Sequence, residues 1–145
     1  MSVAIAVALA LLLMAIAGLH FYWGRGGLWP AASEPALIAT VIGDARAKRM
    51  PSPSLCTLVA ASIALTALWP LLLVGVPGTA SLRPLVVLGG FAIAAVFLLR
   101  GIAGFVPAWQ RLHPLEPFAS HDRRYYSPFC LLVAAGYAAL LLQGN

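Results

Sequence analysis

Four long apolar segments constrain the fold of this chain more than any other feature of its sequence. They cover about residues 3–23, 53–74, 84–106 and 126–142, and the one charged residue inside them is Arg100. A helix needs about 20 mostly apolar residues to cross the hydrocarbon core of a bilayer. Lipid offers the backbone no hydrogen-bond partners, so a spanning segment must satisfy its own N–H and C=O groups, which favours helices. The sequence therefore predicts an all-α membrane protein, with residues 1–145 forming one domain of four transmembrane helices.

The composition agrees with this class. The chain is 62% hydrophobic and 9% charged, whereas soluble domains carry about 25% charged residues. The net charge of +5 needs no nucleic acid to explain it, because basic loops next to a membrane face anionic lipid headgroups. We expect the lipid bilayer as a partner and no nucleic acid.

The basic residues lie mainly on one side of the predicted bundle. Seven of the nine fall in the first and third loops, at Arg25, Arg46, Lys48, Arg49, Arg111, Arg123 and Arg124. The second loop contains only Arg83. The positive-inside rule predicts that loops one and three are cytoplasmic and that both termini lie outside.

Other ionisable groups gather at the same side. The four acids of the chain, Glu34, Asp44, Glu116 and Asp122, all lie in these two loops. Arg100 lies about six residues before the end of the third segment, or roughly 9 Å at 1.5 Å per residue. Since an unpaired charge in a membrane is costly, we predict that Asp122 pairs with Arg100 and that His20 joins them. The alternative for Arg100 is that its side chain snorkels to the nearby headgroups.

The first segment ends in the stretch LHFYWGRGGLWP, residues 19–30. His20 and Trp23 are three residues apart and therefore share a helix face. Trp23 and Trp29 also fit the aromatic belt of a membrane interface. His20 is either an interfacial histidine with a local hydrogen bond or a residue that lines a polar cavity.

The stretch HDRRYYSPFC, residues 121–130, precedes the fourth segment. Ser127 and Pro128 fit an N-cap and a first helical position, so the fourth helix is predicted to begin there. Pro53 and Pro84 likewise lie in or near first turns. Tyr126 is expected at headgroup level, and Asp122 on the approach to the helix.

No metal or cofactor is indicated by the sequence. His113, Glu116 and His121 lie in a Pro-rich loop and lack helical spacing, so we predict no metal site. The cofactor, if one exists, cannot be named from the residues.

Three stretches together resemble the bacterial membrane family known as domain of unknown function 3995. The family shows a His-x-Tyr-Trp run closing the first helix, Phe-x-x-Arg in the third, and Asp-x-x-x-Tyr-Ser-Pro entering the fourth. These motifs fall on His20, Tyr22, Trp23, Phe97, Arg100, Asp122, Tyr126, Ser127 and Pro128. The family typically has Gly-Asp-Phe after the third-helix arginine, whereas this chain has Ala103-Gly104-Phe105, so an acid is missing. The resemblance implies four helices in the bacterial inner membrane and supplies no function.

Three functions fit these observations. The first is a small inner-membrane protein that binds an amphiphile (a lipid, quinone or isoprenoid) in a polar site at one membrane face; the ligand-binding residues would be His20, Tyr22, Trp23, Arg100, Asp122, Tyr126 and Ser127. The second is a membrane-embedded enzyme acting on such a molecule, with His20, Arg100 and Asp122 as catalytic candidates. The third is a subunit of a homo-oligomer or larger membrane complex, which would use small-residue faces such as that of Ala134 and Ala138.

Overall fold

The computed structural model describes residues 1–75 and 80–143, and this part of the chain contains helices and loops but no strand. Four helices are long and apolar enough to cross a membrane. They are α1 (Ser2–Gly24), α3 (Pro53–Leu73), α4 (Arg83–Ala103) and the continuous helical run Phe118–Gln143, which ends in α7 (Ser127–Gln143). The 21 residues of α3 correspond to about 32 Å at 1.5 Å per residue, enough to cross the roughly 30 Å core. The predicted all-α class with four membrane-spanning helices is confirmed.

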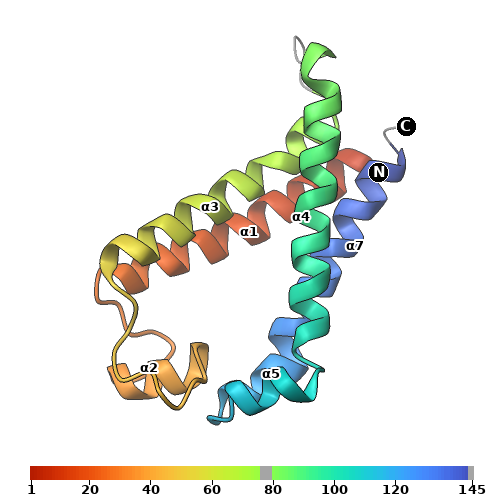
Figure 1. The fold of residues 1–145 in the computed structure, drawn as a ribbon. Coiled ribbons are helices and arrows are strands. Elements are labelled where there is room, and N and C mark those ends of the chain that lie inside the picture. Colours follow the sequence, from red (N-terminus) through yellow and green to blue (C-terminus); the bar gives the residue numbers. More distant parts are fainter. Residues whose placement is uncertain (76–79, 144–145) are drawn as a thin grey trace.

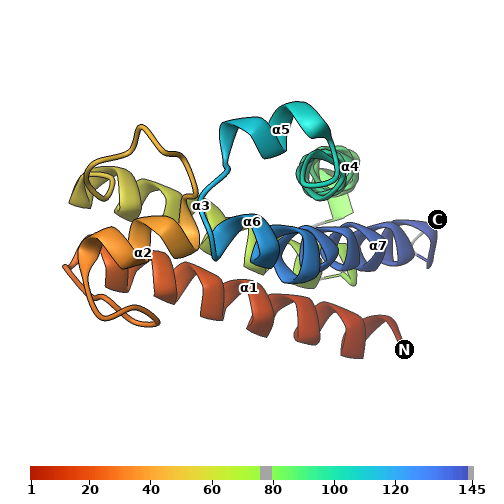
Figure 2. The same ribbon diagram turned by 90° about the horizontal axis from the view of Figure 1, so that it is seen from below.

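The long helices are arranged as two pairs (Figure 1). Helix α1 packs along α3, and α4 packs along α7. The pairs meet where α1 begins and α7 ends, and they diverge toward the end that carries the short helices α2 (Glu34–Val41) and α5 (Pro107–Leu112). Seen from below, α6 (Phe118–His121) lies next to α2 and leads into α7 (Figure 2).

The main hydrophobic core lies at the end where the pairs meet. Its buried members come from the first half of α1, the second half of α3, the start of α4, and the middle and end of α7; they are Ala6, Leu9, Leu13, Ala67, Leu73, Val86, Val133, Tyr137, Leu140 and Leu141. The outer faces of the helices are also apolar. Leu11, Leu65, Leu99 and Leu132, one on each long helix, are all more than 60% exposed, as expected of side chains that contact lipid.

A proline inside α3 explains one contact in this core. Pro70 has no N–H, so the carbonyl of Thr66, four residues earlier, lacks its usual helical donor. A buried carbonyl without a partner is costly, especially in lipid. The hydroxyl of Tyr137, whose side chain is fully buried, donates to this carbonyl from α7. The proline thus creates an acceptor that ties the two helix pairs together.

The start of the fourth helix differs from the prediction. Ser127 has helical dihedral angles (φ −69°, ψ −45°), and its N–H bonds to the carbonyl of Asp122. It is therefore not an N-cap, and the helical run begins at Phe118. The helix passes Pro128 because the turn before it, η2 (Asp122–Tyr126), is a wider π-helical turn. A proline ring clashes with the carbonyl four residues earlier in a regular helix, and a π turn relieves this crowding. Pro53 and Pro84, by contrast, do lie in first turns.

Loops one and three hold the diverging ends of the two pairs together. The Tyr126 hydroxyl donates to the Thr40 carbonyl (3.1 Å), and the Leu115 N–H donates to the Gly43 carbonyl (3.1 Å). Phe118, 4% exposed, covers Gly43, which has a φ of +74° and no room for a Cβ atom. These contacts place both loops at the same end of the molecule.

Candidate functional site

The predicted ion pair between Arg100 and Asp122 is present. Arg100 Nη2 donates to Asp122 Oδ1 at 2.6 Å, and Arg100 Nη1 donates to Ser127 Oγ at 3.2 Å. The Asp122 side chain is 3% exposed, whereas that of Arg100 is 30% exposed. The arginine therefore neutralises a buried carboxylate, which is among the costliest groups to leave unpaired.

The π turn explains why Asp122 and Ser127 face the same arginine. In a regular α-helix, residues five apart point in directions that differ by about 140°. The wider turn places them one above the other, since its hydrogen bonds join residues five apart. Ser127 Oγ donates to Asp122 Oδ1 at 3.1 Å. The backbone irregularity before Pro128 is thus what assembles this polar cluster.

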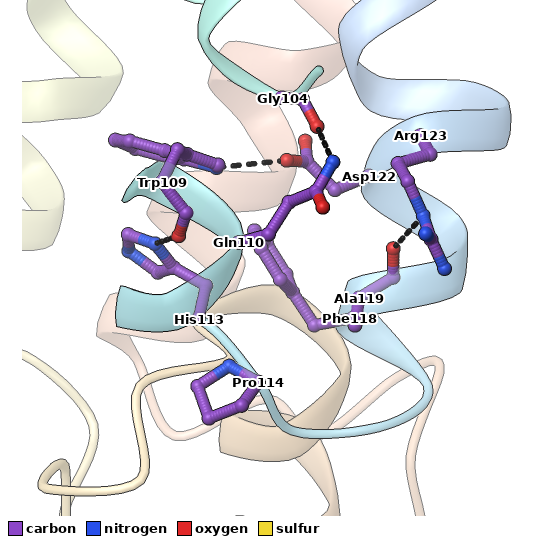
Figure 3. A pocket seen from close by; sticks show the side chains of 9 residues that line it. All are labelled: Gly104, Trp109, Gln110, His113, Pro114, Phe118, Ala119, Asp122 and Arg123. Atoms are coloured by element: carbon purple, nitrogen blue, oxygen red, sulfur yellow. Dashed lines mark hydrogen bonds between the residues drawn. The ribbon is translucent and has the colours of Figure 1, made fainter. Parts of the chain in front are cut away.

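Trp109 of α5 completes the cluster. Its Nε1–H donates to Asp122 Oδ2 at 2.9 Å (Figure 3). The Arg100 guanidinium carbon lies 4.8 Å from the centre of the indole ring, within range of a cation–π interaction. Both carboxylate oxygens of Asp122 accept hydrogen bonds, so the acid is held in one orientation.

Gly104 provides the space for this arrangement. A Cβ atom at this position would collide with Ser127 Oγ and would lie 2.9 Å from Asp122 Oδ2. An acidic side chain at residue 104 would therefore have no room here. The carboxylate at this end of α4 comes from Asp122.

A cavity of about 210 Å³ lies against this cluster. It is bounded by the end of α4, by α5 and by the helix that starts at Phe118 (Figure 3). Its lining residues are Gly104, Trp109, Gln110, His113, Pro114, Phe118, Ala119, Asp122 and Arg123. The wall is mixed, with aromatic and aliphatic surface on one part and polar groups on the other.

Three lining side chains keep hydrogen-bonding capacity. Gln110 Nε2 donates to the Gly104 carbonyl (3.1 Å), His113 Nδ1 lies 3.0 Å from the Trp109 carbonyl, and Arg123 Nε donates to the Ala119 carbonyl (3.2 Å). Since a carbonyl only accepts, His113 Nδ1 must carry the hydrogen. Within the described residues, Gln110 Oε1, His113 Nε2 and the terminal nitrogens of Arg123 make no hydrogen bond.

The residues predicted at the end of the first helix do not join this cluster. His20 Nδ1 lies 2.8 Å from the Ile16 carbonyl, and its ring packs on Trp23 with centroids 5.1 Å apart. Trp23 Nε1 donates to the Trp29 carbonyl at 2.7 Å, and Tyr22 lies over Gly27. The C-terminal ends of α1 and α4 belong to different, diverging pairs (Figure 1). The structure thus gives His20 a partner within its own helix rather than in the ion pair, because α1 and α4 diverge toward these ends.

Trp109, Gln110 and His113 were not among the residues predicted from the sequence. The sequence predicts a loop between the third and fourth spans, whereas in the structure Pro107 begins a short helix there. Trp109 and His113 are four residues apart on that helix, and their rings stack with centroids 4.1 Å apart. Two aromatic rings four residues apart, directly after a proline, form a sequence pattern that indicates such a helix.

Glu116 makes a local hydrogen bond just before the fourth helical run. One of its carboxylate oxygens accepts the Ser120 N–H at 3.1 Å. Hydrogen bonding from the side chain and then from the backbone N–H of Ser120 lowers the pKa of Glu116, with a smaller contribution from the charge of Arg123. Within residues 1–75 and 80–143, His, Cys, Asp and Glu form no group of three that could hold a metal ion.

Comparison with known proteins identifies a family but no activity. The model of the family described as "Protein of unknown function (DUF3995)" matches residues 3–137, so the chain belongs to this family. No curated protein and no solved structure matches the chain.

Proposed function

We propose that this member of a family without an assigned activity binds an amphiphile, with the polar head in the cavity beside Asp122. The observation that carries the proposal is the cavity itself, which lies next to a fixed polar cluster at one end of a lipid-exposed bundle. Such a position suits a molecule with one polar and one apolar end.

The size of the cavity supports a head group rather than a whole ligand. Its volume of about 210 Å³ is below the roughly 300–1,000 Å³ of pockets that enclose drug-sized molecules. The apolar part of the ligand would lie outside, along the membrane-facing surface. Ile102, Phe105 and Val106, which flank Gly104 in the chain, are 47%, 50% and 40% exposed and offer such a surface.

Arg100 acts in this proposal as a positioning residue. Its guanidinium is engaged by Asp122, Ser127 and the Trp109 ring, so it holds the wall of the cavity rather than reaching for the ligand. The enzyme alternative required His20 near this ion pair, whereas the hydrogen bond and the ring contact of His20 are with Ile16 and Trp23 of its own helix.

We place the cavity at the cytoplasmic face of a bacterial inner membrane. Seven of the nine basic residues lie in loops one and three, and the contact between Tyr126 and Thr40 supports a common side for these loops. The positive-inside rule then makes that side cytoplasmic.

Native mass spectrometry of small molecules that co-purify with the protein tests the proposal. Ala119→Leu adds bulk to a residue that lines the cavity, whereas Ala108→Leu makes the same change at an exposed position of α5 that does not line it. The wild type and Ala108→Leu should retain a bound amphiphile, and Ala119→Leu should lose it. A wild type that carries none, or equal retention in both variants, would overturn the proposal and favour a structural subunit.

A further inference from the structure

We infer that the bound head group carries a phosphate ester with at least one hydroxyl donor, and that Arg123 is its ionic partner. The inference rests on the proposed function and names the ligand class of the same cavity. It follows from the charges and from the hydrogen-bonding capacity left around that cavity.

The charge of the cavity favours an anion. Asp122 is the one acid in the lining, and its charge is offset by Arg100 at 2.6 Å. Arg123 is the one arginine or lysine in the same lining. Within the described residues it makes no ion pair at 4 Å or less, and its charge acts on the Glu116 carboxylate only at longer range. Its Nε is held by the Ala119 carbonyl, which fixes the guanidinium while its terminal nitrogens remain available. A guanidinium matches the geometry of phosphate oxygens.

The two neutral side chains add a second requirement. Because Gln110 Nε2 and His113 Nδ1 donate to backbone carbonyls, the atoms left over are Gln110 Oε1 and, in the neutral ring, His113 Nε2. Both are acceptors. A ligand that fits would therefore bring hydrogen-bond donors, such as O–H groups, as well as an anionic group. A phosphate ester with a P–OH group or a neighbouring alcohol does so, whereas a quinone has neither.

A pair of adjacent arginines makes the test specific. Arg123→Gln removes the cation from the cavity. Arg124→Gln makes the same change one residue later, at an exposed side chain that lies over the Tyr125 ring and outside the cavity. Retention of phosphatidylglycerol would be measured by native mass spectrometry in detergent, with diacylglycerol as the lipid without phosphate. Glycerol phosphate would be added as a soluble competitor.

The wild type and Arg124→Gln should bind phosphatidylglycerol in preference to diacylglycerol. Arg123→Gln should weaken binding by roughly 10- to 100-fold, as expected for a lost hydrogen bond between charged groups, and Arg123→Lys should restore part of it. Competition by glycerol phosphate would assign the site to phosphate esters in general, and its absence would assign it to the lipid.

Equal losses in Arg123→Gln and Arg124→Gln would indicate a general effect of surface charge and would overturn the inference. If Arg123→Gln binds as the wild type does and Ala119→Leu does not bind, the inference about the phosphate is wrong, but the proposed amphiphile site stands. Unchanged binding in Ala119→Leu would remove the proposed function itself.

Discussion

Tyr137→Phe should destabilise the protein through the backbone of another helix. The Tyr137 side chain is fully buried, and its hydroxyl donates to the Thr66 carbonyl. Pro70 deprives this carbonyl of its helical donor. The substitution keeps the ring and its packing, and it removes only the hydroxyl, so the part-buried Thr66 carbonyl loses this donor.

The expected cost follows from this geometry. A buried carbonyl left unsatisfied costs about 1–3 kcal/mol. Hydrogen bonds between transmembrane helices average about 0.6 kcal/mol with a maximum near 1.7. Because the alternative donor is absent here, we expect a loss in the upper part of that range, about 1–2 kcal/mol. In a Pro70→Ala background, residue 70 regains an N–H for Thr66, so the cost of Tyr137→Phe should fall below about 0.5 kcal/mol.

The four proteins of this double-mutant cycle would be unfolded with sodium dodecyl sulfate in mixed micelles, and helix content would be followed by circular dichroism. The free energy of unfolding of each variant gives the coupling between the hydroxyl and the proline. An equal cost of Tyr137→Phe in both backgrounds would refute the reasoning, because the carbonyl would then not depend on the tyrosine.

Three further predictions concern the site and the topology. Arg100→Leu should lower the free energy of unfolding by an amount near the low end of roughly 3–5 kcal/mol, since Arg100 is partly exposed, and adding Asp122→Asn should recover much of it in the same unfolding assay. Gly104→Ala should destabilise strongly because its Cβ meets Ser127 Oγ, whereas Gly18→Ala, with nothing within 4 Å, should not; comparable stability of these two variants would contradict the described packing. Alkaline phosphatase fused to either terminus should be active, because both termini are predicted to lie outside. If only cytoplasmic reporters are active at the termini, the predicted orientation is reversed.

The helices and the ion pair could be predicted from the sequence because each depends on a strong local rule. Uninterrupted apolar runs predict the first three long helices within a few residues, and an arginine inside a span needs a partner. Asp122 was the acid nearest to the same membrane face, and the pair is present. Both predictions rest on the cost of polar groups in lipid, which leaves few alternatives.

The remainder of the site depends on contacts that no local pattern specifies. Ser127-Pro128 has the composition of a helix start, but packing of Asp122 and Ser127 against Arg100 favours a continuous helix with a π turn. Trp109 lies nine residues after Arg100 in the chain, and only the reversal of the chain after α4 brings its indole to Asp122. His20 shows the opposite case, because its Nδ1 bonds to the Ile16 carbonyl of its own helix rather than to a distant residue.

The core and the candidate site lie at opposite ends of the bundle, and this separation bears on function. The end that carries Tyr137 joins all four long helices in one buried cluster. The end that carries the cavity is held by few contacts between loops one and three, such as those of Phe118 with Gly43. Ligand-binding elements generally come from the less stable parts of a structure. Both carboxylate oxygens of the buried Asp122 accept hydrogen bonds. This bonding therefore fixes one wall of the cavity at an end where the surrounding packing alone would not.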